Sequence, residues 1–275
     1  MNVRAEHSGS VFVVIDPKRM LQPALIKGEW IATRDNSQLV VYCCIYDATL
    51  DQNEDAQQRE LDLTRTWIER LAAPAEAYGL DVTVTVEWDN LWREAIVAAA
   101  TGAHADLVIK TASRHTALGR RVLKTADWSL LAECVSPILL VRDGHLWENG
   151  TLLAAVKLKP EDSDHDRLNK RIVEASHDLA ENAGFELHAA TAFKGDDIYF
   201  DRQQFADSCG LPRNRVHGAA GSPQKAISSV AAEIGADIIV VGNAGHSMNE
   251  TAQRLVDEVD ADILVLPSPE ASKAA

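Results

Sequence analysis

The 275-residue chain carries a formal net charge of −14, with 46% hydrophobic and 25% charged residues. This composition is typical of a globular protein, and the length allows one or two domains. The negative charge disfavours nucleic acid and anionic membranes as partners. No apolar run reaches the ~18 residues of a membrane span, and the amino terminus has no apolar signal region. We therefore expect a cytoplasmic protein. Its four cysteines form no Cys-x-x-Cys pair, which favours buried free thiols.

The first half alternates apolar runs with segments of helical spacing. The runs predict strands at 11–15, 38–46, 82–86, 106–110 and 138–141. The spacing predicts helices at 23–34, 53–78, 92–100 and 128–133. Pro74 is expected to kink or divide the longest helix. Five strands alternating with four helices predict a parallel sheet with helices on both faces.

Residues 142–150 contain two glycines and no periodicity, after which the pattern restarts. We therefore predict domains at 1–144 and 151–270, with a linker at 145–150. The second half has strands predicted at 152–156, 187–193, 215–218, 238–241 and 263–266. Its helices are predicted at 166–182, 202–208, 223–234 and 251–259.

The two halves also match by residue type. Residues 106–110 match 237–241 at an offset of 131, and 131–141 match 256–266 at an offset of 125. The second half therefore has six fewer residues between these two matches. A repeat of this size predicts two copies of one domain.

Five segments carry a resemblance to a known family: VVIDP (13–17), DLVIK (106–110), TADWSLL (125–131), SPILLV (136–141) and GADIIVVGNAG (235–245). Their order and spacing resemble the tandem, two-domain members of the universal stress protein family. The resemblance implies an adenine-nucleotide-hydrolase-like α/β fold in each half, with five parallel strands in the order 3-2-1-4-5. It also implies paired domains that meet near their last strands as an intramolecular pseudo-dimer, and a homodimer is possible.

The resemblance also implies where a nucleotide site belongs. Nucleotide-binding members carry an Asp after the first strand for the adenine end. After the fourth strand they carry Gly-x-x-Gly, nine residues, then Gly-Ser or Gly-Thr around the phosphates. The first half keeps Asp16, but Thr111 and Arg114 replace the two glycines and Lys124-Thr125 replaces Gly-Ser.

The second half departs from the pattern in a different way. It keeps Gly242 and Gly245, but only three residues follow them where nine are expected, and Asn249-Glu250 replaces Gly-Ser. Lys157 stands at or beside the Asp position, as a phosphate contact or as a plug that fills an obsolete pocket; the plug is favoured. Neither half holds a complete site, so we expect no resident cofactor and only weak binding of ATP.

A local basic segment lies where the resemblance places phosphates. Residues 107–126 contain no acidic residue, and their basic side chains are Lys110, Arg114, His115, Arg120, Arg121 and Lys124. One interpretation is a site for a small anion. The other is a solvated loop, or one that is salt-bridged to the other half. We predict no metal site, because the histidines are scattered.

The sequence contains no Gly-x-Ser-x-Gly elbow and no Walker loop, so no residue is assigned a catalytic role. Three functions remain open. The first is a non-enzymatic stress-response protein that binds a small anion or protein partners. The second is an ATP-binding protein, or slow ATPase, using Gly242 and Gly245 of the second half. The third is a pseudo-dimer whose shape serves assembly.

Overall fold

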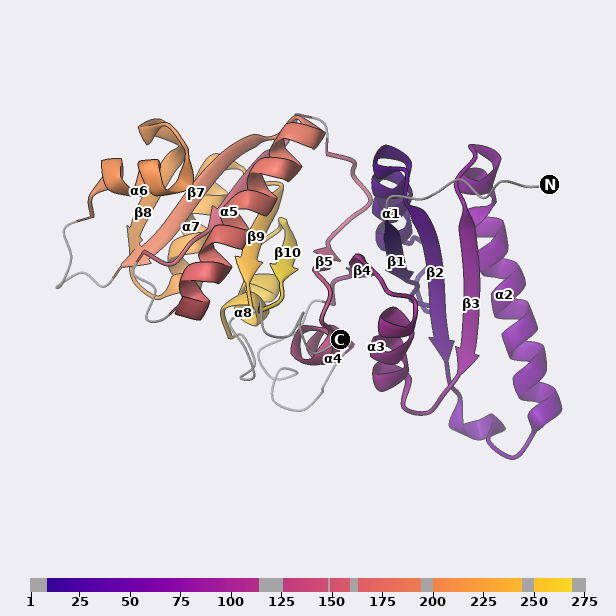
Figure 1. The fold of residues 1–275 in the computed structure, drawn as a ribbon. Helices are drawn as coiled ribbons and strands as arrows, with labels where there is room; N and C mark the ends of the chain where they lie inside the picture. The colour runs from indigo at the N-terminus through magenta and orange to yellow at the C-terminus, as the bar shows by residue number, and fades with distance from the viewer. Residues whose placement is uncertain are drawn as a thin grey trace. The chain divides into compact units, whose positions relative to one another are not determined.

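The computed structural model describes residues 9–113, 126–147, 149–158, 163–193, 200–243 and 250–268 (Figure 1). The described residues separate into two compact units, with the change between Leu146 and Trp147. We call them the first unit and the second unit. Each is an α/β domain built on parallel strands, which confirms the predicted fold class.

Within its described residues, the first unit contains five strands and four α-helices. The strands are β1 (Ser10–Val14), β2 (Gln38–Ile45), β3 (Val82–Trp88), β4 (Leu107–Thr111) and β5 (Ile138–Val141). The helices are α1 (Pro23–Asp35), α2 (Glu54–Ala77), α3 (Trp92–Gly102) and α4 (Ala126–Glu133), with a 3-10 turn η1 (Ala48–Leu50) before α2. The parallel pairings place the strands in the order β3-β2-β1-β4-β5.

Helices cover both faces of this sheet because side chains alternate along each strand. Gly28 of α1 lies so close to β1 that a Cβ placed there would meet Val13 Cγ2 at 2.4 Å. Lys110 is in register with Val14, so it points to the opposite face, where it pairs with Asp127 of α4. Both central strands are therefore buried on both sides, which explains their continuous apolar runs.

The expectation that Pro74 divides the long helix is wrong. Helix α2 runs without a break from Glu54 to Ala77 and contains Pro74. The proline lies close to the carboxyl-terminal end of α2, where its missing N–H removes a single backbone hydrogen bond of the last turns. The chain then turns at Gly79, which has a φ of +93°.

The second unit repeats the arrangement. Its strands are β6 (Thr151–Ala155), β7 (Glu186–Phe193), β8 (Val216–Ala220), β9 (Ile238–Gly242) and β10 (Asp262–Leu266). Its helices are α5 (Ser163–Ala183), α6 (Arg202–Cys209), α7 (Pro223–Ile234) and α8 (Glu250–Glu258), with a 3-10 turn η3 (Arg213–Arg215) before β8. The pairings give the order β8-β7-β6-β9-β10.

Strand register agrees with the internal repeat. Val108 of β4 is in register with Ile138 of β5, and Ile239 of β9 is in register with Ile263 of β10. These residues correspond at the same two offsets found in the sequence.

A further correspondence was missed by the sequence analysis. Asp106 Oδ2 accepts the backbone N–H of Ser10 at 2.8 Å, and Asp237 Oδ2 accepts that of Thr151 at 2.7 Å. Both acceptors precede the fourth strand of their unit, and both donors open the first strand. A Gly before each donor leaves room for the carboxylate, because an added Cβ would meet it at 2.9 Å in the first unit and 2.8 Å in the second. The signal in the sequence is Gly-Ser or Gly-Thr before the first strand with Asp before the fourth.

The predicted linker contains an anchored residue. Trp147 is buried, and its indole N–H donates to the carboxylate of Asp262 at 3.0 Å. Its ring also meets Phe185 edge to face, with 6.0 Å between the ring centroids. The chain is therefore fixed to the second unit three residues before Gly150, where the linker was predicted to end.

Candidate functional site

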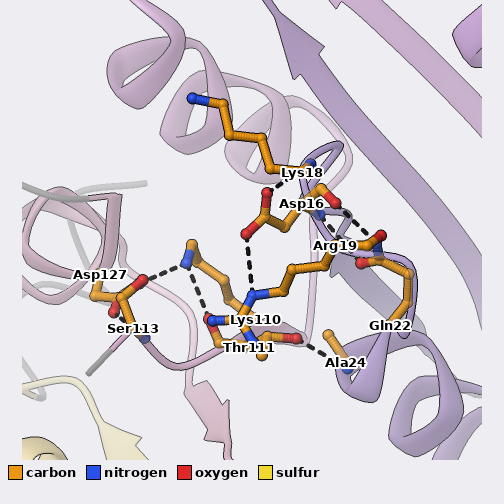
Figure 2. Close-up of polar contacts among 9 residues, drawn as sticks. All are labelled: Asp16, Lys18, Arg19, Gln22, Ala24, Lys110, Thr111, Ser113 and Asp127. Carbon is orange, nitrogen blue, oxygen red and sulfur yellow. Dashed lines mark hydrogen bonds and ion pairs between the residues drawn. The ribbon is translucent and has the colours of Figure 1, made fainter.

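The predicted adenine-end residue lies in a closed loop after β1. Asp16 Oδ1 accepts the backbone N–H of Lys18 at 3.0 Å, and Oδ2 accepts from Arg19 Nε at 3.1 Å. Both carboxylate oxygens of Asp16 thus have partners within its own loop. The Lys18 side chain points away from Lys110 and Asp127 (Figure 2).

A buried glutamine, which the sequence analysis did not single out, fixes this loop. Gln22 Nε2 donates to the carbonyl oxygens of Asp16 and Arg19, both at 2.7 Å, and its Oε1 accepts the Asp16 N–H at 3.2 Å. Only 4% of Gln22 is exposed. One side chain thus supplies three hydrogen bonds to a loop that lacks a regular backbone pattern, and holds Asp16 in place.

Lys110 is the one member of the basic segment's predicted anion site that the structure describes. Its Nζ lies 2.6 Å from Asp127 Oδ1 and donates to the carbonyl oxygen of Thr111 at 3.0 Å. Asp127 is fully buried, and its other oxygen accepts the backbone N–H of Ser113 at 2.9 Å. The positive charge of Lys110 is therefore compensated by a carboxylate that follows the basic segment by one position.

Thr111, at the first lost glycine, has a structural role. Its side chain is buried, and Oγ1 accepts the backbone N–H of Ala24 at 3.2 Å (Figure 2). Ala24 lies in the first turn of α1, whose N–H groups have no partner within the helix. Thr111 thus ties β4 to the start of α1. A glycine at this position has no side chain with which to make that bond.

The remaining members of the predicted first-half site are Arg114, Arg121 and Lys124, and all three lie outside the described residues. The structure therefore brings together Lys110, Thr111 and Asp127 at the carboxyl end of β4. Asp16 lies at the end of the neighbouring strand β1, and Figure 2 shows both groups.

In the second unit, Gly242 ends β9 and is covered by a leucine. A Cβ on Gly242 would meet Leu168 Cγ and Cδ2 at 2.6 Å. Leu168 belongs to α5 and is 5% exposed. The lack of a side chain at Gly242 is therefore used for close packing of α5 on β9. Gly245 lies outside the described residues, as do the three residues after it.

Lys157 does not fill a pocket, because it is exposed. The plug hypothesis for this residue is therefore wrong. Its backbone is held by Asn169 of α5, whose Oδ1 accepts the Lys157 N–H at 3.1 Å and whose Nδ2 donates to the Lys157 carbonyl at 2.8 Å. The chain after β6 is thus fastened to α5.

All four cysteines are buried and free, as predicted. Burial is the main factor that raises the pKa of Cys43 to about 12 and that of Cys44 to about 11. Both thiols are therefore protonated at neutral pH, and the thiolate is the nucleophilic form. Their position in β2, beside β1, gives them a packing role.

The packing at Gly242 leads to a prediction. Gly242→Ala should lower the free energy of unfolding by about 1–3 kcal/mol, because the new methyl group overlaps Leu168 in a packed region. In a Leu168→Ala background the same substitution should cost close to nothing, since the overlapping atoms are gone. Urea denaturation of the four proteins in this double-mutant cycle measures the coupling. Equal costs of Gly242→Ala in both backgrounds contradict the packing role.

Comparisons with known proteins agree with this architecture. The profile of the Universal stress protein family matches residues 9–142. Universal stress protein E of Escherichia coli K12 is 28% identical, with 94% of this chain and 93% of that protein aligned. Its Haemophilus influenzae homolog is 22% identical, with 93% and 96% aligned.

Solved structures show the same fold over the full length. A putative universal stress protein from Pseudomonas aeruginosa UCBPP-PA14 has a TM-score of 0.78 at 22% identity, covering 96% of this chain and 95% of that one. One from Archaeoglobus fulgidus has a TM-score of 0.74 at 16% identity, covering 95% of this chain and 97% of that one.

Within the described residues, no helix has the length and apolar character of a membrane span. With matching motifs and a matching family profile, residues 9–142 form a domain of the universal stress protein family, and the chain as a whole is similar to universal stress protein E.

Proposed function

We propose that this chain is a non-enzymatic stress-response protein of the cytoplasm. It acts by binding a small anion or a protein partner, and neither of its degenerate nucleotide sites holds ATP tightly. The observation that carries the proposal is the buried carboxylate of Asp127, which pairs with Lys110 and accepts the Ser113 N–H. A lysine ammonium group and a backbone N–H are the kinds of groups that bind a phosphate in nucleotide sites, and here both are engaged by Asp127.

In the first unit, this arrangement opposes a nucleotide by charge. A phosphate competes with Asp127 for the same cation and the same N–H donor. Because the Asp127 carboxylate already engages Lys110 and the Ser113 N–H in a buried site, an incoming anion would have to displace it. Asp16 is likewise engaged with Lys18 and Arg19 before any ligand arrives.

In the second unit, the obstacle is steric. A glycine favours phosphate binding when the backbone can approach the ligand closely. Leu168 lies over Gly242 and occupies the space that a side chain there would need, since a Cβ on Gly242 would meet Leu168 Cγ at 2.6 Å. This packing weighs against the rival function, an ATP-binding protein or slow ATPase that uses the second half.

The ligand of the first half, if it is an anion, is assigned to Arg114, Arg121 and Lys124. Arginine offers forked donors that suit oxyanions, and these residues belong to a segment free of acidic side chains. Lys110 contributes little to such a site, because its charge is already paired with Asp127.

Isothermal titration with Mg-ATP tests the proposal. We expect a dissociation constant far above about 1 µM, toward the millimolar range, since each lost contact costs on the order of 1 kcal/mol and 1.4 kcal/mol is about tenfold in affinity. Asp127→Asn should strengthen binding, because it removes the competing charge. Asp62→Asn, an equal charge change on the exposed side of α2, should not.

Two results contradict this proposal. One is a dissociation constant at or below about 1 µM for the wild type. The other is nucleotide released from the purified protein on denaturation, detected by mass spectrometry.

Thermal stabilisation by inorganic phosphate distinguishes a small anion from a protein partner as the ligand. A small anion as the ligand is supported if this stabilisation is lost in the triple variant Arg114→Ala/Arg121→Ala/Lys124→Ala. The control is a triple variant on α2, Arg59→Ala/Arg65→Ala/Arg70→Ala, which should keep it. No stabilisation of the wild type leaves the protein partner as the proposed ligand.

A further inference from the structure

Two histidines meet near the amino-terminal ends of two neighbouring strands of the second unit, the edge strand β8 and the adjacent strand β7. His188 lies on β7 and His217 on β8, and their rings stack with 5.3 Å between centroids. His217 is in register with Ala190, two residues beyond His188, so the two histidines lie on the same face of the sheet. Gly218, the next residue on β8, faces Phe200 on the other side. This cluster has no part in the nucleotide sites, which lie at the carboxyl ends of the strands.

The geometry limits how many protons the pair can hold. His188 Nδ1 and His217 Nε2 are 3.0 Å apart, a hydrogen-bond distance in which one nitrogen donates and the other accepts. A histidine that carries protons on both nitrogens has no acceptor. The contact therefore requires that at least one ring be neutral. When both rings are doubly protonated, the two facing nitrogens are both donors, and the attraction becomes repulsion between two cations.

Charged side chains surround the histidine pair. His188 Nε2 lies 3.3 Å from Glu186 Oε1, and the same oxygen is 3.2 Å from Nε of Arg215 on η3. Burial, followed by the charge of His188, lowers the pKa of His217; Arg202 of α6 adds to this effect, and Glu233 of α7 opposes it. His217 is thus the ring that stays neutral and accepts.

The contact joins the edge strand β8 to its neighbour β7. Within the described residues β8 pairs with β7 alone, from Val216 to Ala220. The strand is short, and its residues Gly218, Ala219 and Ala220 offer little side-chain area for packing. A contact between side chains of β7 and β8 therefore adds to the backbone pairing that holds this edge.

We propose that the His188–His217 pair is an acid-sensitive latch that holds β8 to β7 while at least one ring is neutral and releases it when both rings are doubly protonated. The sign follows from linkage. Because the pKa of His217 is lowered in the closed state, the open state binds more protons. The latch is at full strength above the ordinary value of 6.5 and weakens as the pH falls from there through the lowered pKa.

Hydrogen exchange of the β8 peptide across pH 8 to 5 tests the latch in the intact protein. Protection factors, corrected for the intrinsic exchange rate at each pH, should be constant above about pH 6.5 and fall by up to about tenfold per pH unit below it. In His217→Gln the amide can accept from His188 but does not titrate, so protection should be nearly independent of pH. His177→Gln is the matched control. His177 Nε2 donates to the Cys209 carbonyl at 2.8 Å, a bond that survives protonation, so this variant should keep the wild-type pH dependence.

Imidazole nitrogen NMR gives a second measurement that does not depend on how well β8 folds. At neutral pH, His217 should be neutral with an unprotonated Nε2, and its titration should lie below 6.5. The proposal is overturned if His217 is doubly protonated at neutral pH. It is also overturned if protection of β8 in the wild type does not change with pH, or if His217→Gln retains the same dependence.

Discussion

Lys110→Met is expected to lower the free energy of unfolding by about 3–5 kcal/mol at neutral pH, because it leaves the Asp127 carboxylate in the interior without its cation. Lys110 and Asp127 are 12% and 0% exposed, so water cannot replace the lost partner. Methionine keeps most of the apolar stem of lysine, and the packing change is small. Guanidinium denaturation followed by far-UV circular dichroism measures the loss.

Two further variants identify the cause of that loss. Lys110→Met/Asp127→Asn should recover most of the stability, because the amide oxygen still accepts the Ser113 N–H and no charge remains. Lys170→Met removes a similar pair with Asp166 on the surface of α5, at 2.8 Å, and should have no measurable effect since that pair is well exposed. If the double variant is as unstable as Lys110→Met, the buried charge is not the cause.

Trp147→Ala should destabilise the second unit by about 3–5 kcal/mol, the usual range for truncating a buried tryptophan. The substitution removes both the edge-to-face contact with Phe185 and the N–H donor of Asp262. Trp147→Phe restores a ring but not the donor, and should cost about 1–3 kcal/mol. Thermal unfolding followed by circular dichroism resolves the difference between the variants.

Tyr78→Ala is the control for the loss of an aromatic side chain. Tyr78 is 89% exposed at the end of α2, so its truncation should change stability by less than about 0.5 kcal/mol. A Trp147→Ala protein as stable as Tyr78→Ala contradicts an anchoring role. The segment around Trp147 then acts only as the tether that its composition predicted.

Strands and helices were predictable because the burial of an element determines where apolar residues stand along its sequence. The run Val11–Val14 is apolar without alternation, and it is buried on both faces. The offset of 131 between the halves was equally visible, and strand register reproduces it. Helix ends shifted by a few residues, as at α4, which begins at Ala126 where the pattern predicted residue 128.

The chemistry at the end of β4 was less predictable. Residues 107–126 were interpreted as a basic segment, but the partner of Lys110 is Asp127, one position beyond it. A window of sequence shows charge, whereas pairing depends on how the chain returns to the sheet. The same limit applies at Gly242. The glycine is evident in the sequence, but Leu168, which fills the space beside it, lies 74 positions earlier.

The two aspartates that hold the first strand of each unit also constrain how the protein is made. The Asp106 carboxylate and its donor, Ser10, are 96 positions apart, and Asp237 is 86 positions from Thr151. Both contacts lie between central strands. During synthesis, the edge of β1 that pairs with β4 therefore stays unpaired until β4 has been made. The opposite edge of β1 can pair earlier, because β2 precedes β4 in the chain. Closing such long loops is slow compared with forming helices. Nascent chains in which β4 has not yet emerged thus present an apolar strand edge, the kind of surface that chaperones protect.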